Sequence, residues 1–86
     1  MYINPQKAGL ALGGLFGLLH FLWSFLVALG FAQLLVNFIF VMHFIKPIVE
    51  VGAFNLTTAI GLIIITSVVG FIVGNIFARI WNKVCA

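Results

Sequence analysis

The sequence predicts an all-α membrane protein, a two-span transmembrane helical hairpin with a short amphipathic interfacial helix in the connecting loop. Of its 86 residues, 65% are hydrophobic and only 6% are charged, whereas soluble domains have about 45–50% apolar and about 25% charged residues. Two long stretches free of Asp, Glu, Lys and Arg each exceed the roughly 20 residues that one crossing needs. We therefore expect a single membrane domain over residues 1–86.

The first span is expected over residues 8–29. Asn4-Pro5 is typical of a helix cap followed by the first helical residue. Gly30 is the expected break, because the run before it is almost purely apolar, whereas Gln33 and Asn37 follow it. This run is longer than the about 7–15 apolar residues of a signal peptide, so we expect a helix that is not cleaved.

Residues 33–45 are too few for a crossing and fall in the length class of interfacial or re-entrant segments. We interpret them as a short helix in the headgroup region, with Leu34 and Phe38 among the side chains that dip into lipid. Pro47 is expected to end this helix, because the residue before a proline is forced out of helical geometry.

The second span is expected over residues 56–80, with Asn55 as its cap. Trp81 follows the span and indicates the membrane interface, where the indole ring meets apolar atoms and its N–H finds a partner.

The basic residues predict the orientation. Lys7 flanks the start of the first span, and Arg79 and Lys83 flank the end of the second, whereas the loop between them has only Lys46. By the positive-inside rule, both termini of this multi-pass chain are cytoplasmic in the cell (plasma or inner) membrane. A third crossing after a turn at Gly30 would place the basic residues of the second span outside, so we disfavour it.

Rows of small residues are the strongest pattern in the chain. They recur at four-residue spacing on both spans: Gly9, Gly13 and Gly17 on the first, and Thr66, Gly70, Gly74 and Ala78 on the second. In lipid, small residues let two helix backbones come close enough for van der Waals contact and weak hydrogen bonds. We expect both rows to be helix-packing surfaces. They pack on each other within one hairpin, or one row binds within the chain and the other between chains.

Three polar residues form a possible polar intramembrane site. His20 and Ser24 continue the glycine face of the first span, and Ser67 lies near the middle of the second. An ionisable residue inside a membrane is a functional hypothesis by default. In one interpretation, neutral His20 donates a hydrogen bond to a hydroxyl across the helix pair. In the other, copies of His20 line a proton or ion path in an oligomer.

Asn75, Arg79 and Asn82 share one face near the end of the second span. Arg79 can extend to lipid phosphate while Asn75 bonds to a neighbouring helix. The alternative is a binding site for a partner or a lipid headgroup.

Several function classes are excluded by the same composition. The only acidic residue is Glu50, and the two histidines, His20 and His43, are far apart in the sequence. We therefore expect no catalytic site, no metal site and no cofactor. The net charge of +3 comes from scattered cations, so we expect no nucleic-acid partner.

The two ends of the chain resemble a family of small two-span prokaryotic membrane proteins. The similar segments are 4–13, NPQKAGLALG, and 70–83, GFIVGNIFARIWNK. Some members of that family are labelled bacteriophage-holin-like. The resemblance implies a helical hairpin with glycine-rich packing and no established activity. Members tend to have an acidic residue between the two glycines of the second span, where this chain has Val73.

Two functions follow as hypotheses. The first is a structural or accessory membrane subunit that acts through glycine-mediated helix packing. The second is a holin-like homo-oligomeric pore, with the face of Gly13, Gly17, His20 and Ser24 turned toward its axis. In either case we expect the lipid bilayer as a partner, and either a homo-oligomer or a place in a larger membrane complex.

Overall fold

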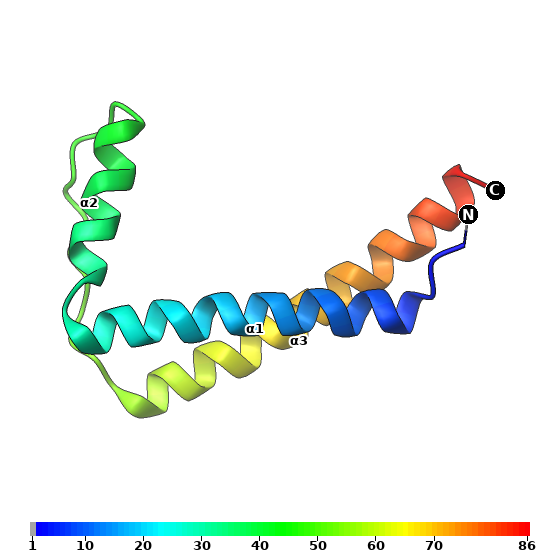
Figure 1. The fold of residues 1–86 in the computed structure, drawn as a ribbon, viewed down its shortest axis with the longest axis horizontal. Helices are drawn as coiled ribbons and strands as arrows, with labels where there is room; N and C mark the ends of the chain where they lie inside the picture. The colour runs from blue at the N-terminus through cyan, green and yellow to red at the C-terminus, as the bar shows by residue number, and fades with distance from the viewer. Residues whose placement is uncertain (1) are drawn as a thin grey trace.

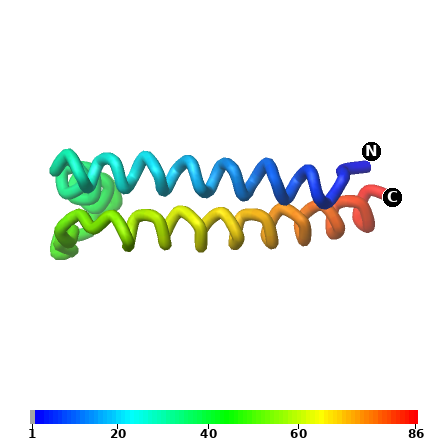
Figure 2. The backbone as a smooth tube through the Cα atoms, turned by 90° about the horizontal axis from the view of Figure 1, so that it is seen from below, coloured from blue at the N-terminus to red at the C-terminus, as the bar shows by residue number. Residues whose placement is uncertain are grey.

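The structure, a computed structural model, describes residues 2–86, so the first residue of the predicted domain lies outside the described range. Three helices are found there: α1 (Pro5–Leu29), α2 (Ala32–Met42) and α3 (Leu56–Val84), with no strand. α1 and α3 pack side by side in opposite directions, which places both chain ends at one end of the hairpin (Figures 1 and 2). The predicted all-α hairpin with a short helix in its connection is confirmed.

Asparagine side chains begin both long helices. The Asn4 side-chain oxygen accepts hydrogen bonds from the backbone N–H groups of Gln6, at 2.9 Å, and Lys7, at 3.2 Å. Asn55 does the same for Thr58 at 3.1 Å. These bonds satisfy N–H groups that have no partner within the helix. Both caps were predicted from the sequence and are confirmed.

α1 and α2 end in the same way, with the two backbone hydrogen bonds of a Schellman motif. After α1, Gly30 has a positive φ of 85°, and the next N–H, of Phe31, donates to the Leu26 carbonyl at 3.0 Å. After α2, Phe44 takes this conformation with φ of 62°, and the N–H of Ile45 donates to Phe40 at 2.8 Å. Gly30 is the break that the sequence predicts.

The ends of two helices differ from the prediction. α2 stops at Met42, short of residue 45, because the left-handed turn at Phe44 ends it before Pro47 can act. α3 continues past residue 80 to Val84, because no glycine or proline interrupts it there.

α2 and the segment that returns from it, residues 43–55, form an arm that turns away from the axis of the hairpin (Figure 1). The Gln33 side chain joins the two parts. Its Nε2 donates to the Val49 carbonyl at 2.8 Å and its Oε1 accepts from the Val51 N–H at 2.6 Å. Gln33 also donates to Asn37 at 2.9 Å, so the two amides of α2 face the returning segment while its exposed side chains are apolar.

The hairpin has no core of large side chains. Its buried residues are small: Gly9, Gly13, Gly17 and Ser24 on α1, and Ala59, Gly70, Gly74 and Ala78 on α3. Most of the large apolar side chains of both helices are exposed, whereas others, such as Phe71 and Trp81, are half-buried. α1 and α3 are long and apolar enough to cross a membrane.

The two left-handed turns predict opposite effects of substitution. Gly30→Ala should lower the stability of the hairpin by about 1 kcal/mol, because a Cβ atom is unfavourable at positive φ. Phe44→Gly should raise the stability of the hairpin by a similar amount, because it removes a Cβ atom at positive φ. The Phe44 side chain is fully exposed, so its loss removes no stabilising packing within residues 2–86.

Thermal unfolding in detergent, followed by far-ultraviolet circular dichroism, measures both changes. Gly52→Ala is the control, because Gly52 has no positive φ and open space around it. Equal effects of the Gly30 and Gly52 substitutions would contradict the interpretation.

Candidate functional site

The central feature of the molecule is the contact between the two glycine rows. On α3, the position that a Cβ atom would occupy on Gly70 lies 2.6 Å from the Leu12 carbonyl oxygen and 2.9 Å from the Gly13 Cα. The corresponding position on Gly74 is filled by the Ala8 carbonyl and lies 2.9 Å from the Gly9 Cα. Each of these α3 glycines therefore lies directly against the backbone of α1.

The contact is reciprocal. The Cβ position of Gly9 lies 2.8 Å from the Phe71 carbonyl oxygen, and that of Gly13 lies 2.8 Å from the Ser67 carbonyl oxygen. Carbonyl oxygens of each helix thus face glycine Cα atoms of the other, which is the geometry of weak Cα–H···O hydrogen bonds. Of the two arrangements that the sequence left open, the structure has the one in which both rows pack on each other within one hairpin.

The rest of the two rows follows the same antiparallel register. The Cβ position of Gly17 meets the hydroxyl of Ser67, and the fully buried Ala78 extends the α3 row toward the chain ends. Thr66, which the sequence pattern places in this row, gives none of the atoms nearest to the α1 glycines. Its hydroxyl donates instead to the Leu62 carbonyl of its own helix at 2.8 Å. Ser67 therefore occupies the position that was expected for Thr66.

His20 does not make the expected hydrogen bond across the helix pair. Its Nδ1 lies 2.8 Å from the Phe16 carbonyl oxygen of its own helix, and because a carbonyl can only accept, the ring nitrogen donates. Ser24 is buried and lines a hollow that it shares with Ala59 of α3. Ser24 and Ser67 thus lie at the helix interface, but no hydrogen bond joins His20 to either of them in the described chain.

Amide side chains close both ends of the hairpin, a role that the sequence did not reveal. At the end that holds the termini, the Asn82 Oδ1 accepts from the Ile3 N–H at 2.8 Å and its Nδ2 donates to the Ile3 carbonyl at 2.7 Å. This two-point pairing joins residues 79 positions apart in the chain. Gln33 pairs with the returning segment in the same way. The only sequence signal was the presence of amides in apolar surroundings.

The predicted interface anchors gather at the end that holds the termini. Lys7 is exposed in the first turns of α1, and Arg79 and Lys83 are exposed in the last turns of α3. The Trp81 ring lies 6.2 Å from that of Phe77, and its indole N–H is buried without a hydrogen-bond partner among residues 2–86.

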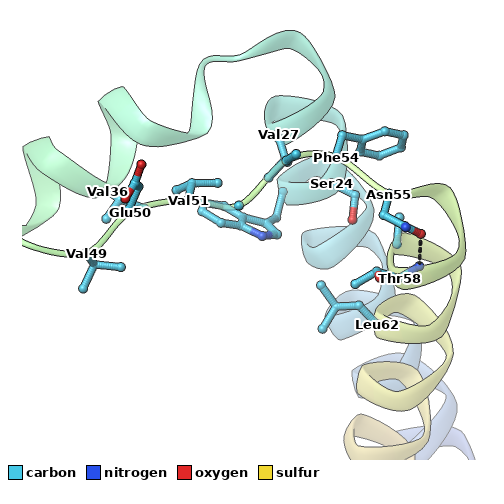
Figure 3. A pocket seen from close by; sticks show the side chains of 14 residues that line it. Ser24, Val27, Val36, Val49, Glu50, Val51, Phe54, Asn55, Thr58 and Leu62 are labelled. Atoms are coloured by element: carbon cyan, nitrogen blue, oxygen red, sulfur yellow. Dashed lines mark hydrogen bonds between the residues drawn. The ribbon is translucent and has the colours of Figure 1, made fainter.

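A cavity of about 340 Å³ lies at the opposite end, between α1, α3 and the returning segment (Figure 3). Trp23 and Ser24 line it from α1, and Asn55 and Thr58 line it from α3. The exposed Glu50 borders it from the returning segment. Within residues 2–86, no hydrogen bond joins the Glu50 carboxylate to the hydroxyl of Ser24 or Thr58, so the cavity has no nucleophile paired with a base. In the described chain, no group of three or more His, Cys, Asp or Glu residues is placed to hold a metal ion.

Comparisons of the chain with protein-family models, with curated proteins and with solved structures found no match. The similarity of its two ends to small two-span prokaryotic membrane proteins therefore stays a prediction.

Neighbouring glycines on α1 give a matched test of the helix contact. Gly13→Ala should lower the stability of the hairpin by about 1–3 kcal/mol, because its Cβ would meet the Ser67 carbonyl and push the helices apart. Gly14→Ala should raise stability by up to about 1 kcal/mol, because Gly14 faces open space and alanine favours the helix.

Thermal unfolding in detergent compares these two variants. Gly70→Ala and Gly61→Ala form the equivalent pair on α3, since only Gly70 contacts the other helix. If the two members of each pair change stability equally, the glycine contact is not what joins the helices.

Proposed function

We propose that this chain is a small integral membrane protein that acts as a structural or accessory subunit. The observation that carries the proposal is the mutual packing of the glycine rows, because it uses small residues inside and leaves large apolar side chains outside. Exposing that apolar surface to water would cost much free energy. Contact with lipid, or with the helices of another membrane protein, avoids this cost. Glycine-mediated packing then builds the hairpin as a preformed unit, whose outer faces contact its neighbours.

The distribution of charge supports an orientation with both termini in the cytoplasm of the cell membrane. Lys7, Arg79 and Lys83 lie at the end that holds the termini, whereas the arm has Lys46 and Glu50. Basic residues near the ends of membrane spans favour the cytoplasmic side.

A holin-like pore is the alternative proposal, and the geometry favours it less. Such a pore would turn the face of Gly13, Gly17, His20 and Ser24 toward a central path. In the hairpin, Gly13, Gly17 and Ser24 are buried, with both glycines against α3 of the same chain, and the half-buried His20 bonds to its own helix. Without a rearrangement of the two helices, little polar surface is left to line a path through an oligomer.

Gentle extraction from the native membrane, followed by native mass spectrometry with lipid retained, tests the proposed role. Co-extraction with a larger, different protein is the expected result, because the outer faces of the hairpin would contact that protein. A closed ring of identical copies with no other protein would contradict the accessory role and favour the pore.

The His20→Leu variant separates the two proposals by a different measurement. The stability should change by less than about 1 kcal/mol, because the hydrogen bond of His20 is made within its own helix. Proteoliposomes with a pH gradient should show no proton flux above that of empty vesicles for either the wild type or the variant.

His43→Leu is the control, because His43 also donates to its own helix, at the Ile39 carbonyl. A pH-dependent flux that His20→Leu abolishes and His43→Leu preserves would overturn the accessory role.

A further inference from the structure

Arg79 lies between two hollows at the end of the hairpin that holds the termini. The first, of about 450 Å³, is lined by the N-terminal residues and by one face of α3: Tyr2, Asn4, Pro5, Gln6, Phe71, Asn75 and Arg79. The second, of about 490 Å³, is bordered by Arg79, Lys83 and Asn82, with Tyr2 and Pro5 opposite. We propose that this pair of hollows, which we call the Arg79 site, binds the phosphodiester of an anionic phospholipid. The proposal rests on the membrane insertion proposed above.

Two hydrogen-bonded contacts build the site. Asn75 accepts from the Arg79 Nε at 2.7 Å, which fixes the guanidinium and leaves its two terminal nitrogens as donors. Asn82 holds the backbone of Ile3, and this positions Tyr2 and Asn4 on the opposite wall. A guanidinium held in this way can present two parallel N–H donors to a phosphate, a geometry that a lysine lacks.

The charge at this end favours an anionic lipid over a zwitterionic one. Lys83 follows Arg79 by one helical turn. The only acidic residue, Glu50, lies in the arm at the opposite end of the hairpin (Figure 1). No acidic side chain lines either hollow to meet a choline or ethanolamine group, whereas the phosphate and net negative charge of phosphatidylglycerol meet two cations.

The depth of Arg79 fits a headgroup. It lies five residues before Val84, the last residue of α3, and at 1.5 Å per residue this is roughly 8 Å from the helix end. The backbone N–H groups of Gln6 and Lys7 are already bonded to the Asn4 cap. The phosphate is therefore held by side chains of α3 and not by the start of α1.

Competition between lipids tests the site. The full chain in detergent is titrated with phosphatidylglycerol and with phosphatidylcholine of the same acyl chains, and retained lipid is counted by native mass spectrometry. The wild type should prefer phosphatidylglycerol, and Arg79→Gln should weaken that preference about fivefold. Arg79→Lys should lie between the two, because it keeps the charge but loses the paired donors.

Lys7→Gln is the matched control, because Lys7 lies at the same end of the hairpin and lines neither hollow. It should leave the preference within about twofold of the wild type, since its effect is confined to the general surface potential. Equal losses in the Lys7 and Arg79 variants would overturn the site and leave only that general attraction. Displacement of phosphatidylglycerol by excess inorganic phosphate would overturn the assignment to a lipid.

Two further measurements keep the outcomes distinct. Far-ultraviolet circular dichroism verifies that each variant keeps its helices. Resistance of the chain to alkaline extraction from vesicles tests insertion by itself. A chain that fails to insert refutes the proposed membrane function, whereas an inserted chain without lipid preference refutes only the Arg79 site.

Discussion

The close approach of two backbones at four glycines is the contact on which the rest of the structure depends. Carbonyl oxygens of Ala8 and Leu12 fill the space where Gly74 and Gly70 have no Cβ, and the reverse holds for Gly9 and Gly13. No large side chain is fully buried in the described chain, so the hydrophobic burial that stabilises soluble proteins contributes little here. The helices are joined by dispersion forces and weak hydrogen bonds, which act only at short range. The interface is therefore sensitive to a single added methyl group.

That interface fixes the two helices side by side, and amide side chains fix its ends. Asn82 pairs with both backbone groups of Ile3 at one end, and Gln33 pairs with Val49 and Val51 at the other. Each amide satisfies one donor and one acceptor of an irregular segment that has no helix or strand to do so. In a medium without water, unsatisfied backbone groups are costly, so such pairings matter more than on a soluble protein surface. Asn82 and Gln33 thus satisfy backbone groups of the segments that lie outside the helices.

Much of this fold is predictable because its signals are local. Asn4 and Asn55 are caps by their chemistry and position, and Gly30 ends α1 because glycine tolerates a positive φ. The rows of small residues are also visible in the sequence. The sequence does not reveal which helix each row contacts, because a row that packs within a hairpin and a row that packs between chains have the same spacing.

The remaining differences come from tertiary geometry. Ser67 and Thr66 are about 100° apart around α3, and only the relative rotation of the helices decides that Ser67 meets Gly17. The His20 ring nitrogen donates to the Phe16 carbonyl oxygen of its own helix. Which acceptor it bonds depends on the distance to each competing acceptor, which the sequence does not give. The turn at Phe44 contradicts local preference altogether, since glycine is favoured there.

The arm then constrains how the hairpin sits in a bilayer. Irregular backbone exposed to lipid is not found inside the hydrocarbon region, so insertion of the hairpin as proposed would place the returning segment, with Lys46 and Glu50, at the membrane surface. α2 presents apolar side chains such as Leu34 and Phe38 on its exposed side, and its amides face that segment. The arm therefore has two layers, α2 and the returning segment, which the Gln33 amide joins. If it rests on the surface in this way, α1 and α3 extend from it into the membrane, and Arg79 and Lys83 reach the headgroups of the opposite leaflet.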